Sequence, residues 1–138
     1  IIYIMDTKLK VGFYLNGDKT VTKVKSKDSI AVVFDVVNRL AVLPLDYQYN
    51  FKDLQSVICG LGNEDYAAEI PTQGHLMHEH YDELSKALLR LGTAFPKKHC
   101  WTADKHDEGS YYTQLIQSGY VNHAGEEEQC PAVLVIAF

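Results

Sequence analysis

The chain has no long apolar run and no excess of basic residues. Its 138 residues carry a net charge of −5. No apolar stretch approaches the roughly 18 residues of a membrane-spanning helix, so we expect no membrane insertion. Binding to nucleic-acid phosphates requires a basic stripe, so the acidic balance argues against a nucleic-acid partner. The lysines between positions 8 and 27 are interleaved with strand-like residues and indicate a solvated strand face.

Motifs of known catalytic chemistry are also missing. There is no G-x-S-x-G elbow, no phosphate loop and no dinucleotide fingerprint, so we expect neither an enzyme nor a cofactor. None of the three cysteines (Cys59, Cys100 and Cys130) lies in a C-x-x-C pair, so no zinc or redox motif is indicated. An odd count leaves at least one thiol unpaired within the chain. The sequence leaves open whether Cys100 and Cys130 form a disulfide, and whether the chain is exported.

The most informative stretch that is present is the last one, residues 132–138. It reads Ala-Val-Leu-Val-Ile-Ala-Phe, without a polar residue or a glycine. A strand that is covered on both faces has such a continuous apolar run, and Val133, Val135 and Ile136 are β-branched. We therefore predict a buried C-terminal strand inside a sheet that the N-terminal half of the chain closes.

The rest of the chain changes its hydrophobic period twice. Strand patterns come first, with an Asn16-Gly17 hairpin turn and a central hairpin formed by 29–34 and 40–45. A helix begins after the N-cap Asn50 and ends at Gly60 or Gly62, and a second helical region runs from Thr72 to Gly92. Strands then return. Composition and order predict an α+β chain of one domain, 1–138, with an N-terminal hairpin over 1–28. The remaining expected segments are strands at 10–15, 20–25, 100–103, 111–116 and 120–123, and loops at 63–69 and 104–109.

Two clusters could hold a metal ion. His75 and His78, or His75 and Glu79, would share a helix face, but His-Glu-x-x-His is absent and a third ligand would have to come from His99, His106 or His123. Asp104, Asp107 and Glu108 could supply oxygen ligands for calcium. A solvated helix turn is favoured for the first cluster, so we predict no metal site. Residues 126–128, Glu-Glu-Glu, are predicted to form a solvated loop.

Several short motifs together resemble one family. They are Ile70-Pro71-Thr72-Gln73-Gly74-His75-Leu76 before a helix, Leu91-Gly92 at its end, His99-Cys100-Trp101-Thr102, the aromatic strand from Tyr112 to the turn at Gly119, and the ending 132–138. The chain resembles the C-type-lectin-like domains of bacterial surface, pilus-associated and phage tail proteins. The resemblance implies a C-type-lectin-like core over 29–138, with a mixed or antiparallel sheet in which N- and C-terminal strands close together. The Glu-Pro-Asn and Gln-Pro-Asp motifs of calcium-dependent sugar binding are absent, and so is the cysteine pair of the formylglycine-generating enzymes. Neither activity is therefore implied.

These observations favour a non-enzymatic recognition module at a bacterial or phage surface, outside the cell, that binds a protein or a glycan. Ligand-binding loops on a rigid sheet are typical of such modules, and tyrosine gives a large contact area at low entropic cost. Trp101 is expected in the core. The alternative is a structural or assembly subunit of a pilus or tail, in which the apolar ending forms a subunit contact and the chain self-associates. The expected ligand-binding residues follow the tryptophan: Asp104, His106, Asp107, Tyr112, Tyr120, Asn122 and His123.

Overall fold

A computed structural model describes residues 9–45, 48–61, 68–76, 81–91 and 98–138. The helix stops expected at Gly62 and Gly92 lie outside these residues, and so do His78 and His80 of the histidine-rich stretch. Within the described part, no helix is long and apolar enough to cross a membrane.

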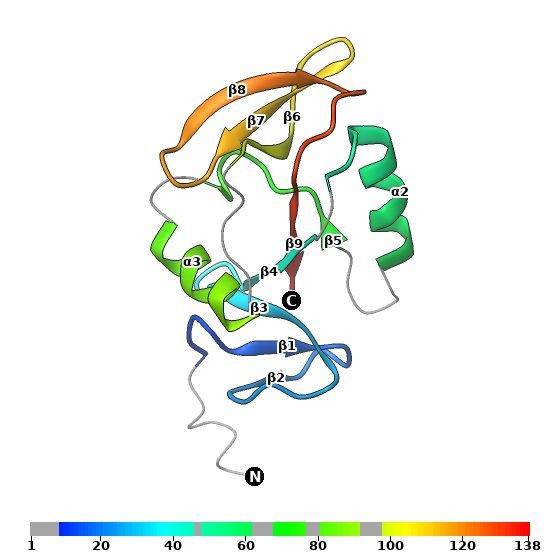
Figure 1. The fold of residues 1–138 in the computed structure, drawn as a ribbon. Helices are drawn as coiled ribbons and strands as arrows, with labels where there is room; N and C mark the ends of the chain where they lie inside the picture. The colour runs from blue at the N-terminus through cyan, green and yellow to red at the C-terminus, as the bar shows by residue number, and fades with distance from the viewer. Residues whose placement is uncertain (1–8, 46–47, 62–67, 77–80, 92–97) are drawn as a thin grey trace.

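Within the described residues, the larger of two sheets has six strands in the order β2-β1-β3-β4-β9-β5, and every adjacent pair is antiparallel. Figure 1 shows β9 and β4 running through the middle of the molecule. The expected central hairpin is confirmed as β3 and β4. The strands are β1 (Tyr14–Asn16), β2 (Val21–Thr22), β3 (Ser29–Asp35), β4 (Leu40–Pro44), β5 (Ala68–Glu69) and β9 (Val133–Ala137).

Strand β9 lies inside this sheet, as its apolar run predicts. It pairs with β4 from Leu40↔Ala137 to Pro44↔Val133, and with β5 through Ala68↔Ile136. The four residues from Val133 to Ile136 are all buried. Their side chains alternate between two core clusters, because successive residues of a strand face opposite sides of the sheet. The N-terminal half therefore does close onto the C-terminal strand, although the partner is β4 and not the first strand β1.

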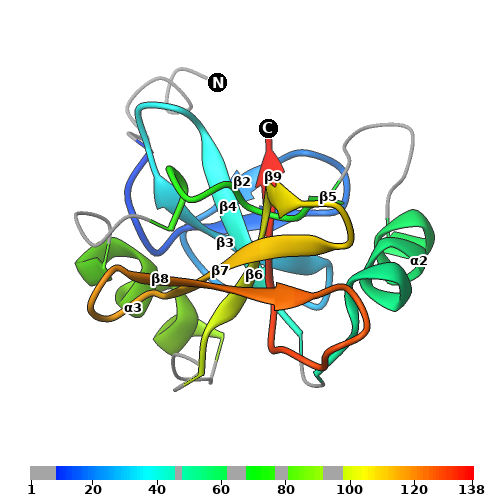
Figure 2. The same ribbon diagram turned by 90° about the horizontal axis from the view of Figure 1, so that it is seen from above.

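Two helices lie on opposite sides of the central strands (Figures 1 and 2). Helix α2 spans Phe51–Leu61, and the side chain of Asn50 caps it by accepting the N–H of Asp53 at 2.8 Å. Helix α3 spans Tyr81–Arg90. Leu84 and Leu88 of α3 belong to one core cluster, whereas Phe51 and Leu54 of α2 belong to the other. The two apolar helix faces thus cover the two faces of the six-stranded sheet.

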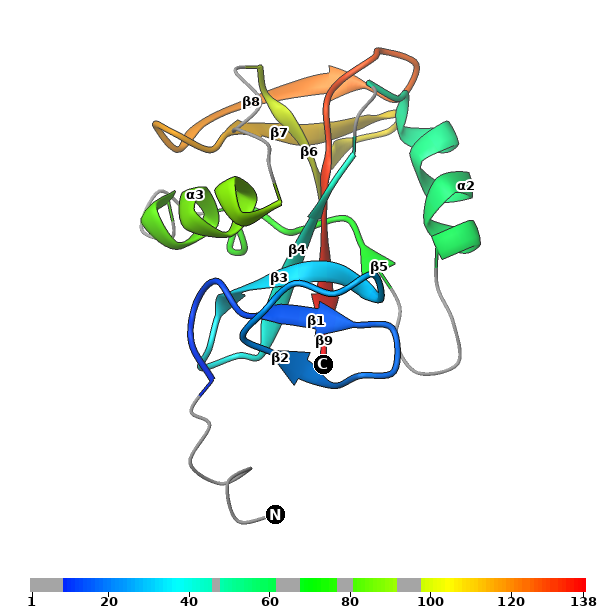
Figure 3. The same cartoon turned by 60° about the horizontal axis from the view of Figure 1, so that its bottom comes forward.

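The second sheet is a three-stranded meander of β6 (Cys100–Asp107), β7 (Ser110–Leu115) and β8 (Tyr120–Gly125), in the order β6-β7-β8. It lies at the opposite end of the molecule from β1 and β2 (Figures 1 and 3). Trp101 anchors it: the ring is fully buried, and the indole N–H donates to the carbonyl of Tyr49 at 2.7 Å. The expectation that Trp101 is a core residue is confirmed.

Several expected boundaries are wrong. The first strand, expected over 10–15, spans only Tyr14–Asn16, and the described helix of the second helical region begins at Tyr81, whereas residues 73–76 form a turn. Residues 104–107 are strand and not loop, because Lys105 and Asp107 pair with Tyr111 and Ser110, and only Glu108 and Gly109 form the turn. Ala68–Glu69 is also a strand, although a loop was expected there. The strand expected over 20–25 is limited to its residues 21 and 22. The chain is α+β, as the order of its segments predicts, and the strands of the described residues form two antiparallel sheets.

Candidate functional site

Three of the expected ligand-binding residues meet on one face of the meander. Tyr112 of β7 is directly opposite His123 of β8, which places both side chains on the same face. The His106 ring stacks on the His123 ring, with centroids 4.0 Å apart and planes at 1°. The Tyr112 ring meets His106 edge-on, with centroids 5.0 Å apart. We name these three residues the imidazole–tyrosine face.

Asp107 and Ser110 fix the orientation of the His106 ring. The Ser110 hydroxyl donates to Asp107 Oδ1 at 2.8 Å, and its oxygen lies 3.0 Å from His106 Nδ1. A hydroxyl has one proton, so Ser110 can only accept from His106, and this places a proton on Nδ1. Nε2 is then the ring nitrogen that is left for a ligand.

This serine, histidine and aspartate do not have the arrangement of a catalytic triad. In a triad the aspartate and the serine contact different nitrogens of the imidazole. Here Asp107 Oδ2 and Ser110 Oγ lie 3.3 and 3.0 Å from the same atom, Nδ1 of His106. Ser110 is also buried and donates its proton to Asp107. The arrangement positions an imidazole and does not activate the serine.

Asp104 forms a hydrogen bond within the chain, so its carboxylate is not free on the surface. Its carboxylate accepts the backbone N–H of Gln73 at 2.7 Å, across 31 residues of sequence. The neighbouring Ala103 N–H donates to the carbonyl of Pro71 at 2.8 Å. Together these bonds attach β6 to the Ile-Pro-Thr turn at residues 70–76. Asp104 therefore holds the base of the sheet, although we expected it among the ligand contacts.

Tyr120 and Asn122 lie away from the imidazole–tyrosine face. Asn122 is opposite Thr113, so its side chain starts from the other face of the meander, and its carbonyl oxygen accepts the N–H of His123 at 2.8 Å. Tyr120 is 68% exposed at the far end of β8, with its ring edge-on to His99 at 6.1 Å. The structure thus brings together four of the seven expected residues, namely His106, Asp107, Tyr112 and His123.

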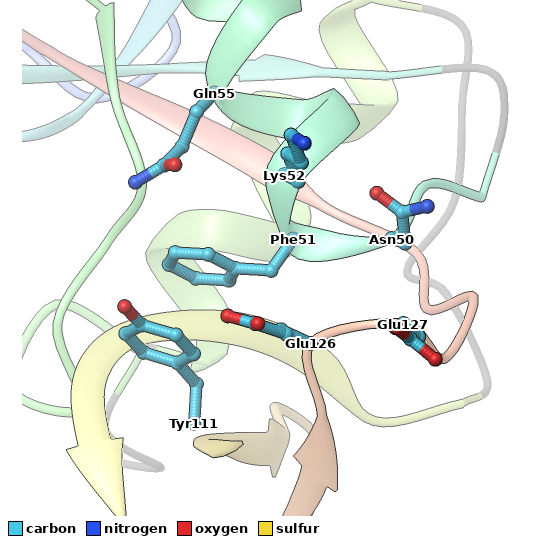
Figure 4. Close-up of a pocket in the computed structure, with 7 residues that line it drawn as sticks. All are labelled: Asn50, Phe51, Lys52, Gln55, Tyr111, Glu126 and Glu127. Atoms are coloured by element: carbon cyan, nitrogen blue, oxygen red, sulfur yellow. The ribbon is translucent and has the colours of Figure 1, made fainter. Parts of the chain in front are cut away.

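A cleft between α2 and β7 was not expected from the sequence. The rings of Phe51 and Tyr111 stack at 3.6 Å with planes at 8°, and this pair borders two adjoining hollows of about 490 and 670 Å³. Such volumes are typical of ligand pockets. We name the two hollows the α2–β7 cleft. Figure 4 shows the first hollow, in which Gln55 lies beyond the outer edges of the two rings, and Glu126 and Glu127 lie on its lower side.

One sequence signal could have indicated this cleft. Tyr111 and Tyr112 are neighbours on a strand, so their rings must point to opposite faces of the sheet. Tyr112 is among the expected ligand-binding residues, and Tyr111 is not. Residues 126–128 are exposed, as expected for a solvated loop, but Glu126 and Glu127 also line the cleft.

In the histidine-rich stretch, His75 lies within the described residues and hydrogen-bonds with Thr72. The backbone N–H of Thr72 donates to His75 Nδ1 at 3.1 Å, and the Thr72 hydroxyl oxygen accepts the N–H of His75 at 3.2 Å. This reciprocal pair has the geometry of a capping box, but residues 73–76 form a turn, and the described helix α3 begins at Tyr81. Among the described residues, no three histidine, cysteine or carboxylate side chains gather around a point that could hold a metal ion. That the histidine-rich stretch binds no metal stays a prediction, because His78 and His80 lie outside the described residues.

All three cysteines are free thiols. Burial raises the pKa of Cys100 to about 12, with a smaller contribution from the nearby Cys130. Burial, followed by the charge of Glu128, raises the pKa of Cys130 to about 11 against the opposing effect of Lys98. Both thiols are therefore protonated and unreactive near neutral pH.

No protein-family model matches the chain, and no curated protein matches it significantly.

Proposed function

We propose that this chain is a non-enzymatic recognition module with a C-type-lectin-like fold, displayed at a bacterial or phage surface, and that it binds a protein or a glycan through the imidazole–tyrosine face. The observation that carries the proposal is the cluster of rings formed by His106, Tyr112 and His123. None of the three belongs to either core cluster, so packing of the interior does not explain their association.

The proposed fold is supported by the way the chain closes. The C-terminal strand β9 pairs with β4 of the hairpin β3–β4, two helices intervene, and the meander β6–β8 precedes β9. The Ile-Pro-Thr turn, which is one of the motifs of the resemblance, supports β6 through the carbonyl of Pro71 and the N–H of Gln73.

The chemistry of the face suits a polar ligand with some apolar surface. A tyrosine and two histidines each present an apolar ring and a polar tip, so they can contact carbon atoms and hydrogen-bond at once. Asp107 and Ser110 orient His106 in advance, which lowers the entropic cost of binding. A rigid β-sheet base keeps the rings in place without the ligand.

The assembly alternative loses its main sequence argument. It expects the apolar ending to form a subunit contact, but β9 lies between β4 and β5, and the side chains of Val133 to Ile136 are buried within the chain. The outer strand β8 is also protected against edge pairing, since Asn122 and Glu128 accept the backbone N–H groups of His123 and Gly125. Self-association stays a prediction, and sedimentation equilibrium over a range of concentrations measures it.

The test is a screen followed by matched variants. We expect the wild type to give reproducible signals on an array of bacterial surface polysaccharides or on a peptide-display library. His106→Ala, Tyr112→Ala and His123→Ala combined should abolish those signals. The control is Lys23→Ala with Lys25→Ala, two exposed residues in the N-terminal hairpin region. Signals that survive the triple change but disappear in the control would place the site at the other end of the molecule.

A further inference from the structure

The α2–β7 cleft is a second site that the imidazole–tyrosine face does not use. Tyr111 borders the cleft and Tyr112 belongs to the face, and these neighbours on β7 point to opposite sides of the sheet. We propose that the cleft binds a basic, extended peptide segment of a protein partner, with apolar side chains between its lysines or arginines. The two sites share no residue, so either proposal can fail alone.

The cleft is held open by contacts within the chain. The N–H of Phe51 donates to the carbonyl of Glu126 at 3.0 Å, which ties the start of α2 to the turn after β8. The Phe51 ring also packs edge-on against the buried Trp101, with centroids 5.4 Å apart. Both sides of the cleft are therefore fixed before a ligand arrives, which reduces the entropic cost of binding.

The charges that line the cleft select a cation. Glu126 and Glu127 border one hollow and Glu69 borders the other, and Lys52 is the one cation among the described residues that line them. In the described part of the chain, none of these carboxylates forms an ion pair or a side-chain hydrogen bond. Unpaired carboxylates beside a hollow favour a lysine or arginine side chain and oppose an anionic ligand.

The second hollow supplies apolar contacts beside these charges. Ile58, Ile70 and Ala103 line it together with the Phe51–Tyr111 pair. The methylene stem of a lysine, or an apolar side chain next to it, can lie on such a surface while the charged group reaches a carboxylate. An extended peptide that alternates apolar and basic residues matches this juxtaposition.

A glycan fits the cleft less well. A sugar ring stacks on an open aromatic face, but Phe51 is only 4% exposed and covers one face of Tyr111. The pair therefore offers ring edges more than ring faces. The site favours a peptide, and a neutral oligosaccharide serves as the rival ligand in the test.

The test is fluorescence anisotropy with three labelled octapeptides of alternating sequence, Leu-Lys, Leu-Glu and Leu-Ser. Measurements at physiological ionic strength screen long-range attraction, because the Debye length is then about 8 Å. We expect the Leu-Lys peptide to bind best. Glu126→Gln with Glu127→Gln should weaken its binding about ten-fold. Gln55→Trp, at an exposed position between the two hollows, should block binding without a change of charge.

The matched control is Asp28→Asn with Glu108→Gln, which removes the same charge from exposed positions outside the cleft. We expect it to bind the Leu-Lys peptide as the wild type does. Equal binding of the three peptides would overturn the proposal, and so would a control that loses as much affinity as the cleft variant. Binding of chitohexaose that Gln55→Trp abolishes would assign the cleft to a glycan and also overturn it. Each variant's melting curve verifies that it is folded.

Discussion

The strands β9 and β8 have opposite environments although each belongs to an antiparallel sheet of the same chain. Strand β9 is paired on both edges, and the side chains of Val133 to Ile136 are buried on both faces. Strand β8 is the outer strand of the meander, and its residues from Tyr120 to His123 are all exposed. Only Ala124 of β8 is buried.

This difference separates the part of the molecule that supplies stability from the part that is free to carry recognition. Each of the four buried side chains of β9 belongs to one of the two core clusters, so a substitution at any of them disturbs the core. Most residues of β8 belong to neither cluster and can change without disturbing it. Burial of a large apolar side chain contributes about 1.5–3 kcal/mol, while exposed substitutions usually change stability by less than about 0.5 kcal/mol. The comparison therefore predicts effects of very different size in the two sheets.

The largest effect is expected in β9. Deletion of residues 136–138 removes Ile136, which pairs with Ala41 and Ala68, and should prevent stable folding. The milder change Leu134→Ala should lower the free energy of unfolding by about 2–5 kcal/mol. Urea denaturation followed by circular dichroism measures both. Val37→Ala is the matched aliphatic control, because Val37 is 90% exposed, and its midpoint should not move. A truncated chain that melts like the wild type would show that β9 is dispensable.

A loss of stability of intermediate size is expected within the meander, from a change at Asp104. Asp104→Ala removes the acceptor of the Gln73 N–H and should cost about 1.5–3 kcal/mol, the range for hydrogen bonds to a charged group. His123→Ala, on the exposed outer strand, should cost less than about 0.5 kcal/mol. Thermal unfolding of the two variants beside the wild type gives both values. If the two variants were equally stable, the distinction between the supporting base and the recognition face of the meander would be lost.

Much of the fold could be predicted because its signals are local or continuous. The apolar run of 132–138 has one plausible place in a globular chain, which is the inside of a sheet, and the structure confirms it. Asn50 and Thr72 have side chains that accept a backbone N–H three residues ahead. Asn50 caps α2 as expected, and Thr72 makes the same kind of bond to His75 within a turn. Periodicity and caps are properties of short windows of sequence.

The length of β6 could not be predicted in this way. Residues 104–107 are polar and charged, so they look like a loop, yet they continue the strand because β7 supplies its hydrogen-bond partners. The role of Asp104 has the same origin, since its partner Gln73 is 31 residues away. Strand pairing depends on such non-local partners, and side-chain polarity indicates only that a strand is exposed.

The candidate site could be predicted only in part, because its geometry also depends on strand pairing. The stretch after Trp101 is rich in polar and aromatic residues, and this is visible in the sequence itself. Its division into two faces follows from the register of Tyr112 with His123 and of Thr113 with Asn122. A shift of one residue would exchange these faces, and the register depends on how the two strands pair and on the turn that joins them. The α2–β7 cleft depends in addition on the contact of Phe51 with Tyr111, 60 residues apart in the sequence.

The smallest effect at neutral pH is expected where the two sheets meet, at Cys100 at the start of β6 and Cys130 shortly before β9. Burial raises the pKa of Cys100 from 9.0 to about 12. The unfolded chain therefore loses this proton near pH 9, whereas the folded chain holds it until about pH 12. Well below pH 9 the ionisation of the thiol makes no difference to stability, and between pH 9 and about pH 12 the unfolded state is increasingly favoured.

Thermal unfolding between pH 8 and pH 10.5 measures this loss. The melting temperature of the wild type should fall with pH, and Cys100→Ala should fall less steeply, even if it starts lower. Tyrosine ionisation affects both proteins alike, so the difference between the two slopes isolates the thiol. Cys59→Ala, at an exposed position of α2, should keep the wild-type slope.

Iodoacetamide labelling with peptide mapping gives a second readout: at pH 8 Cys59 should react while Cys100 and Cys130 stay unmodified, because the pKa values of these two thiols are about 12 and about 11. Parallel slopes together with rapid labelling of Cys100 would mean that the junction of the two sheets opens to solvent, and the meander would then be a separately unfolding part of the molecule.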